Sequence, residues 1–400
     1  MSRTLGYVTP VRAFSADGTI WMQSASGKIA EALARNYGKI FICAPVVHKA
    51  PPGPFDKPLD AKNVELIEQP SWRTTADSIP HLFEIARAYW RTCRHADVLL
   101  VRGLCPYTAA LYASAAIHRK PICHWIVGDT VSLLRTGTRR GRVFDALALL
   151  YALQDRGVTR LGRWLTNGTL ICNGRELARS YASPRTTEVV SSTIEERDFF
   201  HRADTCQGPV ARILFVGFIR PEKGIEYLLD AVSLLSTDLT WELEIVGLDE
   251  FPKYRKKLDD AVAALGLGDR IRWTGYVPNG QLLFDRMRAA DLFALPTLSE
   301  GTPHVLVEAR ANGLPCISTT AGGVPSTVID GYDALLVPPK DPYALALAIE
   351  RVIRDGELRR ALIHNGLEGA RKQTLERFIG TVVRELDASL RAVDQAVAHE

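Results

Sequence analysis

The sequence of 400 residues has no long hydrophobic run and no export signal. No apolar stretch approaches the ~18 residues that a membrane-spanning helix needs. The first residues, Met1–Val8, lack a signal-peptide pattern and predict a strand instead. With 46% hydrophobic and 24% charged residues, the composition is that of a soluble globular chain of two domains. We therefore expect a cytoplasmic protein, and the inner face of a membrane stays open as its working place.

Paired cysteines are also missing. The seven cysteines stand singly, none forms a Cys-x-x-Cys pair, and their number is odd (Cys43, Cys93, Cys105, Cys123, Cys172, Cys206 and Cys316). This pattern favours buried thiols in a reducing compartment over a disulfide framework or a zinc site.

Two further absences exclude classes of function. The Gly-x-Gly-x-x-Gly fingerprint of dinucleotide oxidoreductases does not occur, since neither Gly6 nor Gly217 opens such a run. Nucleic-acid binding would need a basic face with interleaved aromatic residues. The arginines between positions 135 and 163 have only Phe144, Tyr151 and Trp164 among them, so we expect no nucleic-acid partner.

Charge is unevenly distributed. Residues 1–205 carry a formal net charge of +9 and residues 206–400 one of −5. The basic half suggests an acidic partner, either a phosphorylated acceptor or an anionic membrane surface, or it reflects a solvated surface only. Seven arginines lie within 135–163, around the apolar segment Val143–Leu153. Such a segment can lie on an anionic membrane, and the alternative is a helical pair packed on a sheet with its arginines in solvent.

Alternating strands and helices run through the whole chain and predict an α/β protein built from parallel βαβ units. The pattern fades over residues 191–208, where we place the interdomain linker, near 200–209, and then restarts with six strands that alternate with helices. This gives domains at 1–205 and 206–373. A last helix at 374–400 has no sheet left to cover, so we expect it to cross back to the first domain.

The richest stretch is Leu298–Ala309, which holds two carboxylates around a helix start. Thr302 is expected to cap this helix and Pro303 to occupy its first position, with the end at Gly313-Leu314-Pro315. The helix N-terminus is an anion site. Glu300 lies just outside it and Glu308 lies six residues inside, roughly 9 Å along the axis. Glu300, the helix N-terminus with an anion bound to it, and Glu308 would therefore bind three successive parts of one long ligand.

A basic loop supplies the second half of this site. The strand that begins near Arg212 ends at Gly217, where a glycine lets a ligand approach the backbone. Arg220 and Lys223 follow before the next helix, where cations would meet a diphosphate. Alone, each feature also fits an ordinary solvent-exposed surface. Their combination at the carboxyl ends of strands favours one phosphate-binding site.

These residues resemble a known family. The motifs that carry the resemblance are Phe215–Gly224, Leu243–Gly247, Ile271–Pro278, Asp291–Pro303, Glu308–Pro315, Gly322–Pro325 and Asp330–Pro339. They resemble retaining glycosyltransferases of family 4, which have the GT-B fold. The resemblance is dense over about 212–355 and rests on strand–helix order alone over 1–190. It implies two Rossmann-like doubly wound domains that face each other across a cleft.

The resemblance also implies roles. The second domain would bind a nucleotide-diphosphate sugar, UDP favoured, and the first an unknown hydroxyl acceptor, anionic or lipid-linked. Glu300 would contact the donor sugar, Glu308 the ribose and Lys223 the diphosphate. The backbone of Gly301, Thr302, Pro303, His304 and Val305 would meet sugar and phosphate, and Tyr276 and Val277 the base. The family needs no metal or other cofactor, and the chain has no Asp-x-Asp to argue otherwise.

The sequence departs from the family at three places. Phe218 occupies the position of the usual arginine, so Arg220 is the substitute candidate. The family's His-Asp is Gly128-Asp129 here, which leaves Asp129 as a catalytic and acceptor-side candidate. His124 is an acceptor-side candidate or a core residue, and Gly18 stands in for a Gly-Gly pair.

The function that the resemblance implies is transfer of a hexose with retention of configuration, in cell-envelope polysaccharide, glycolipid or secondary-metabolite synthesis. In this family the departing phosphate oxygen can take the proton of the acceptor hydroxyl. Two alternatives stay open at this point. One is a sugar-nucleotide epimerase of similar fold, and the other a partner-dependent or inactive nucleotide-sugar binder.

Overall fold

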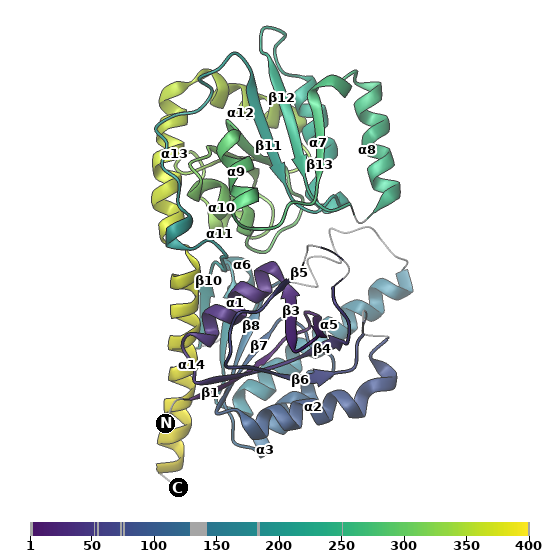
Figure 1. Cartoon of the computed structure of the whole chain (residues 1–400), viewed down its shortest axis with the longest axis vertical. Coiled ribbons are helices and arrows are strands. Elements are labelled where there is room, and N and C mark those ends of the chain that lie inside the picture. The colour runs from purple at the N-terminus through teal and green to yellow at the C-terminus, as the bar shows by residue number, and fades with distance from the viewer. Residues whose placement is uncertain are drawn as a thin grey trace. The chain divides into compact units, whose positions relative to one another are not determined.

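The computed structural model describes residues 3–51, 53, 56–72, 74, 77–128, 142–181, 185–249 and 251–398, without the side chains of 142–145, 147–148 and 394–398. The chain divides into two compact units. Unit 1 comprises Met1–Val189 with Glu376–Glu400, and unit 2 comprises Val190–Leu375. Each unit is an α/β domain, as expected (Figure 1). No helix among the described residues is long and apolar enough to cross a membrane.

Unit 1 is built on a mostly parallel sheet in the order β10-β9-β8-β7-β1-β4-β2-β3-β5, with β6 also paired to β4. Its strands are β1 (Thr4–Val8), β2 (Ala13–Ala16), β3 (Thr19–Gln23), β4 (Lys39–Val47), β5 (Asp56–Pro58), β6 (Val64–Gln69), β7 (Val98–Arg102), β8 (Ile122–Ile126), β9 (Thr169–Asn173) and β10 (Thr186–Val189). Its helices are α1 (Ser24–Ala34), α2 (Leu82–His95), α3 (Thr108–Ile117), α5 (Arg142–Leu165), α6 (Arg175–Ser180) and α14 (Leu375–Ala398).

Two expectations from the sequence were wrong in unit 1. We expected residues 9–24 to be a loop containing Asp17-Gly18-Thr19, but they contain the antiparallel hairpin of β2 and β3. Asp17 and Gly18 form its two-residue turn with φ of 49° and 74°. Both values lie in the left-handed region, which a type I′ hairpin turn requires and which Asp-Gly readily supplies. Strand β5 likewise lies within residues 49–62, which we expected to be loop.

The last helix belongs to unit 1. Phe378, Ile379, Val382 and Leu386 of α14 are buried, and the Phe378 ring lies 4.9 Å from that of Trp125 on β8. Thr187 of β10 donates a hydrogen bond of 2.8 Å to Glu385. The helical spacing of these apolar residues therefore marks a face that packs on the first sheet.

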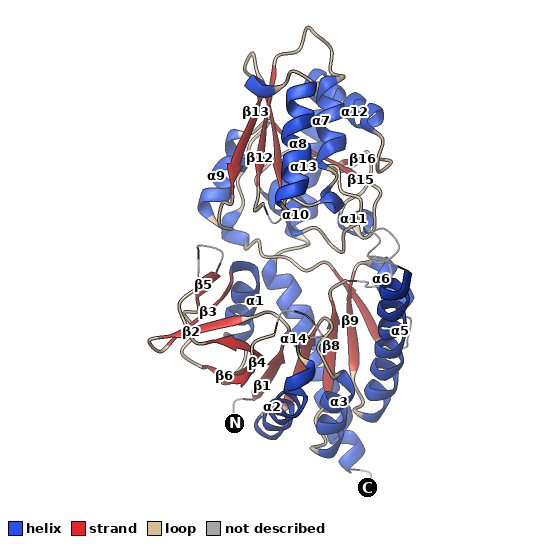
Figure 2. Ribbon diagram, turned by 90° about the vertical axis from the view of Figure 1, so that its right-hand side faces the viewer, coloured by secondary structure: helices blue, strands red, loops and turns tan. Residues whose placement is uncertain are grey.

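Unit 2 has a six-stranded parallel sheet in the order β13-β12-β11-β14-β15-β16. Helices lie on both of its faces (Figure 2). The strands are β11 (Ala211–Val216), β12 (Trp241–Val246), β13 (Ile271–Gly275), β14 (Leu292–Leu295), β15 (Cys316–Thr319) and β16 (Leu335–Val337). The helices are α7 (Ile225–Ser233), α8 (Pro252–Ala264), α9 (Gln281–Ala289), α10 (His304–Ala311), α11 (Val324–Thr327), α12 (Pro342–Arg354) and α13 (Gly356–Arg371). The order reverses between β11 and β14, which is the topological switch point of a doubly wound sheet.

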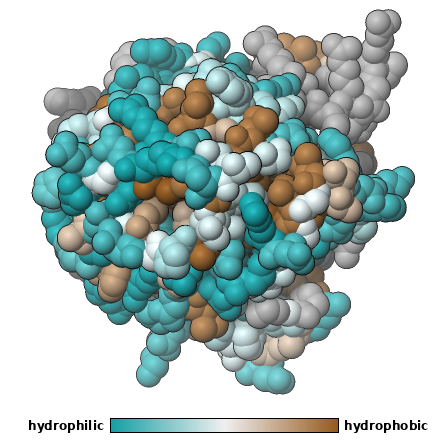
Figure 3. Space-filling model, turned by 90° about the horizontal axis from the view of Figure 1, so that it is seen from above, coloured by the Kyte–Doolittle hydropathy of each residue, from teal (hydrophilic) through white to brown (hydrophobic). Residues whose placement is uncertain are grey.

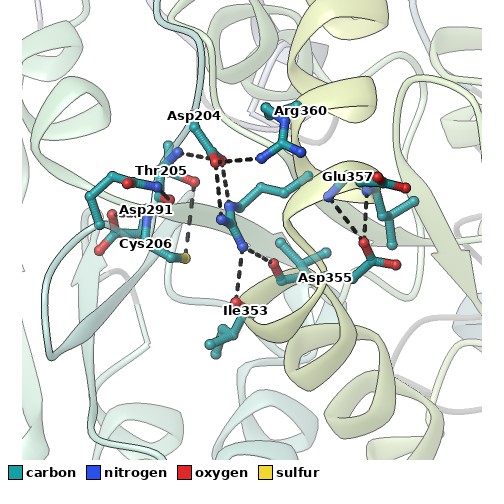
Figure 4. A network of polar contacts seen from close by, with 12 residues as sticks. Asp204, Thr205, Cys206, Asp291, Ile353, Asp355, Glu357 and Arg360 are labelled. Carbon is teal, nitrogen blue, oxygen red and sulfur yellow. Dashed lines mark hydrogen bonds and ion pairs between the residues drawn. The ribbon is translucent and has the colours of Figure 1, made fainter.

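The boundary between the units lies at Val189/Val190 and not at 205/206. The residues that we interpreted as a linker, near 200–209, form hydrogen bonds with the helices of unit 2. Asp204 accepts two hydrogen bonds from Arg359, of 2.6 and 3.2 Å, and one from Arg360 (Figure 4). The Phe200 N–H donates to Ala311 at the end of α10. Loss of periodicity marks a segment without regular structure, but it does not show which domain that segment packs on.

Candidate donor-binding site

The site in unit 2 is centred on an ion pair across the switch point. Lys223 follows β11 and Glu300 follows β14, and the Lys223 ammonium forms a salt bridge with the Glu300 carboxylate. The two side chains are only 18% and 14% exposed. Because β11 and β14 are neighbours, their carboxyl ends bring together two groups that lie 77 positions apart.

Glycines allow the loops of this edge to approach closely. A Cβ on Gly224 would overlap the Pro296 carbonyl oxygen, and one on Gly247 would overlap that of Gly217. A Cβ on Gly322 would likewise overlap the Glu300 carbonyl oxygen, and one on Gly323 would overlap that of Gly301. The Gly323 N–H donates to the Glu300 carbonyl at 2.9 Å, so the loop that carries Glu300 is held from β15.

The loop that carries Lys223 is joined directly to the one that carries Glu300. The carbonyl of Glu222 accepts hydrogen bonds from the Leu298 N–H at 2.8 Å and from the Thr297 hydroxyl at 3.1 Å. Thr297 is fully buried. The backbone of the site is thus fixed by short contacts between strand ends, as preorganised binding of a charged ligand requires.

Helix α10 begins differently from our expectation. It runs from His304 to Ala311, Pro303 is its N-cap residue, and no side chain caps it. Thr302 therefore does not cap the helix, and its hydroxyl lies 3.4 Å from that of Ser191. The end is as expected, because Gly313 adopts a φ of 68° and Leu314 N–H donates back to Ala309.

The Glu308 carboxylate is buried and accepts two hydrogen bonds. Its side chain is only 4% exposed. One carboxylate oxygen, Oε1, accepts hydrogen bonds from the Thr193 hydroxyl at 2.6 Å and the Asn279 amide at 2.7 Å. A buried carboxylate needs such partners, and here they also set its orientation. Glu308 is therefore built into the site, with its carboxylate held by two different loops.

Three contact residues escaped the sequence reading: Ser191, Thr193 and Asn279. The Ser191 hydroxyl lies 2.7 Å from His304 Nε2. Ser191 and Thr193 come shortly after β10, in the segment where the strand–helix pattern fades, and Asn279 stands in an Asn-Gly pair before α9. The Ser-Ser-Thr run was the available signal, but nothing in a single sequence places it beside α10.

The remaining donor-side candidates lie at the same edge of the sheet. Gly217 follows β11, and Tyr276 and Val277 follow β13; all three are half-buried. Val305, in the first turn of α10, and Val277 pack against the core of unit 2. The guanidinium of Arg220 lies 4.6 Å from the ring centroid of Phe218, so the two side chains form a cation–π contact. Phe218 occupies the position of the family's usual arginine, and it thus contacts Arg220, the candidate substitute for that arginine.

The two acceptor-side candidates that the structure describes, Gly18 and His124, do not form one site. Gly18 is the exposed tip of the β2–β3 hairpin. His124 is fully buried, and its ring nitrogens meet the Tyr112 hydroxyl at 3.0 Å and the Gly103 carbonyl at 2.8 Å. Burial lowers its pKa. His124 is thus a core residue with a hydrogen-bond partner for each ring nitrogen, which is the second of the two alternatives that the sequence left open. Asp129 lies outside the described residues.

Metal ligands do not cluster in the described part of the chain: no group of three or more His, Cys, Asp or Glu side chains there is arranged to hold an ion. All seven cysteines are described and unpaired, and six of them are buried. Burial raises the pKa of the Cys43 thiol to about 11. These thiols serve as small apolar core groups.

Solved structures similar to this one include glycosyltransferases of the GT-B class. Sucrose-phosphate synthase from Thermosynechococcus elongatus superimposes with a TM-score of 0.73 at 19% identity, over 97% of this chain and all of that one. Anabaena HepE in complex with UDP gives 0.69 at 16% identity, over 96% and 100%. At these identities the likeness defines the fold, which is GT-B.

Sequence comparison identifies the family. The family model described as "Glycosyl transferases group 1" matches residues 197–369. The lipopolysaccharide core biosynthesis glycosyltransferase LpsD of Rhizobium meliloti is 31% identical over 269 residues, which are 65% of this chain and 74% of that protein. The chain belongs to the glycosyl transferases group 1 family.

Other relatives are matched over a shorter part. An uncharacterised glycosyltransferase of Methanocaldococcus jannaschii is 30% identical over 184 residues, 46% of this chain and 45% of that protein. The chain likewise spans less than half the length of further curated relatives that it matches.

Proposed function

We propose that this protein transfers a sugar from a nucleotide-diphosphate sugar, with UDP as the favoured nucleotide, to an acceptor hydroxyl, with retention of configuration and without a metal. The observation that carries the proposal is the Lys223–Glu300 ion pair across the β11/β14 switch point, where ligands of doubly wound sheets bind. HepE, which shares the fold, has been crystallised with UDP and with UDP-glucose.

Each group has a role in this proposal. The Lys223 ammonium would bind the diphosphate, and the N-terminus of α10 would add backbone N–H donors and the positive end of its dipole. Glu300 would hold the sugar hydroxyls, and Glu308 the ribose hydroxyls. Cation and helix together would stabilise the negative charge that develops on the leaving phosphate, which removes the need for a metal ion.

Retention would follow from the face of the sugar that the acceptor attacks. The acceptor hydroxyl would attack from the face that the nucleotide leaves, and a phosphate oxygen of the leaving group would take its proton. No strong protein base is then required at the anomeric carbon. For the acceptor, we favour a saccharide of the cell envelope, because LpsD, the relative matched over 74% of its length, is a lipopolysaccharide core glycosyltransferase.

The ion pair gives an experiment that separates binding from transfer. Before a donor arrives, Lys223 is neutralised by Glu300, and the incoming diphosphate must compete for it. Glu300→Gln removes this competition and one negative charge, so we expect UDP to bind at least as tightly while transfer falls severely. Lys223→Met should weaken both. Thermal stabilisation by UDP, compared with GDP, ADP and dTDP, with and without EDTA, measures the binding.

Product analysis decides the reaction class. We expect sugar transfer only with an acceptor present, and we expect EDTA to leave it unaffected. The NMR spectrum of the product should show the same anomeric configuration as the donor. UDP release without acceptor alongside an epimerised sugar would indicate an epimerase. Nucleotide binding without turnover of any donor would indicate a binder. Unchanged transfer by Lys223→Met or Glu300→Gln would remove that residue from the proposed mechanism.

A further inference from the structure

Helix α5 of unit 1 exposes a stripe of large apolar side chains. Four of its described residues are strongly exposed: Leu150 63%, Leu153 52%, Leu161 59% and Trp164 74%. Their positions, i, i+3, i+11 and i+14, lie on one side of a helix with about 3.6 residues per turn. The opposite side of the helix is buried, at Ala152, Asp155 and Thr159, and α5 packs beside α3. The exposed stripe is therefore a second apolar face, which the fold of unit 1 does not use.

The other 24-residue helix of unit 1, α14, buries its apolar face instead. Helices α5 and α14 both have 24 residues and both are amphipathic. The apolar face of α14, including Phe378, Val382 and Leu386, is buried on the sheet. On the face of the molecule shown in Figure 3, hydrophilic residues predominate and the hydrophobic ones lie between them in small groups. An exposed apolar stripe such as that of α5 marks an interaction surface.

The charges beside the stripe are positive. Arg156, Arg160 and Arg163 follow one another along α5 at the same helical spacing. Arg160 is exposed, Arg163 lies near both Arg160 and Arg185, and Arg156 stacks over Tyr181. Among the α5 side chains that the structure describes, Asp155 is the only acidic one, and it is buried. The outer face thus combines leucine, tryptophan and arginine without a described carboxylate.

We propose that this face of α5 docks on an anionic lipid membrane. The helix would lie in the plane of the interface, with the leucines and Trp164 about 5–10 Å deep at the acyl boundary and the arginines at the lipid phosphates. Apolar burial and charge attraction both contribute to such binding, and tryptophan is favoured at the interface. The proposal does not depend on the donor chemistry of unit 2, and it assigns a membrane-facing side to unit 1.

Co-sedimentation of the whole chain with lipid vesicles tests the proposal. We expect binding to phosphatidylcholine vesicles that contain phosphatidylglycerol, little binding to phosphatidylcholine alone, and weakening as salt is raised. Leu153→Gln combined with Trp164→Gln should reduce partitioning by at least about tenfold, given the apolar area removed. Arg160→Gln should reduce binding to the anionic vesicles only. The matched control is Leu347→Gln on α12, since Leu347 is also 52% exposed.

Several results would overturn the proposal. These are no binding of the native chain to anionic vesicles, equal binding to neutral ones, or native binding by the Leu153/Trp164 variant. A native dimer in solution that this variant converts to monomer would instead assign the face to a second copy of the chain. Because these changes are at exposed positions, unaltered thermal unfolding and unaltered stabilisation by UDP should accompany them, which separates this test from that of the donor site.

Discussion

The hydroxyl of Thr193 donates a 2.6 Å hydrogen bond to the carboxylate of Glu308. Thr193 lies in the segment that leads into the first strand of unit 2, and Glu308 lies inside helix α10. The contact joins two parts of the sequence that are 115 positions apart and fixes the orientation of the buried acid. Asn279, from the loop before α9, completes the arrangement by donating to the same oxygen.

Removal of the Thr193 hydroxyl should weaken nucleotide binding while the fold persists. Thr193→Val keeps the shape of the side chain, but it takes a hydrogen bond from a charged group, an interaction of ~1.5–3 kcal/mol. We expect UDP affinity to fall about tenfold or more, measured by titration calorimetry. Thr193→Ser retains the hydroxyl and should restore most of the affinity. Equal affinities for the valine and serine variants would show that the bond does not position Glu308.

A methyl group on Gly323 should disturb the site without any change in charge. Its Cβ would overlap the Gly301 carbonyl oxygen, so the loop with Glu300 must shift. A displacement of about 1 Å can reduce turnover ~100-fold, and we expect a loss of that order for Gly323→Ala in steady-state kinetics. Gly208→Ala is the matched control, because a Cβ there meets nothing within 4 Å. Native turnover in Gly323→Ala would mean that the loop tolerates the shift.

The buried ion pair of Arg310 and Asp333 should be important for the stability of unit 2. Arg310 is fully buried and donates to Asp333 at 2.6 Å and to the Thr327 carbonyl at 3.1 Å. Arg310→Met leaves the Asp333 carboxylate buried without its cation, which costs ~3–5 kcal/mol. Urea unfolding should show this loss. Adding Asp333→Leu should recover a large part of it, since the unpaired charge is then gone, and no recovery would contradict this explanation.

Asp204 should make the stability of unit 2 depend on pH in the acid range. Burial acts to raise its pKa, but hydrogen bonds from Arg359, the Thr205 N–H and Arg360 outweigh it and hold the pKa below its usual 3.8. A carboxyl with a lowered pKa stabilises the folded state above its unfolded value, and this contribution is lost as the pH falls through the folded pKa. The melting temperature of the native protein should therefore fall below about pH 4.

The variant Asp204→Asn isolates this contribution. We expect a lower melting temperature than native at pH 7 and a smaller decrease below about pH 4, because the group that titrates is gone. Asp17→Asn, at the exposed β2–β3 turn, is the control and should follow the native profile. Parallel pH profiles of Asp204→Asn and the native protein would show that Asp204 adds nothing to acid unfolding.

The sequence by itself determined the α/β class, the six strands of unit 2 and the acids that are candidates for the donor site. Hydrophobic periodicity and glycines at strand ends are local signals, so they can be read from one chain. Glu300, Lys223 and Gly313 could be assigned in this way. The Asp-Gly turn between β2 and β3 carried a similar local signal, yet the loop reading overlooked it.

Tertiary structure alone decided which distant residues meet. The neighbouring positions of β11 and β14 place Lys223 against Glu300, and neither loop by itself shows which strands are neighbours. The contacts of Ser191 with His304 and of Thr193 with Glu308 arise because the supposed linker packs on α10. Likewise, periodicity marks both α5 and α14 as amphipathic, but only packing shows that the sheet covers α14 and leaves the leucines of α5 exposed. A sequence encodes an apolar face locally, whereas the surface that buries it is assembled from residues elsewhere in the chain.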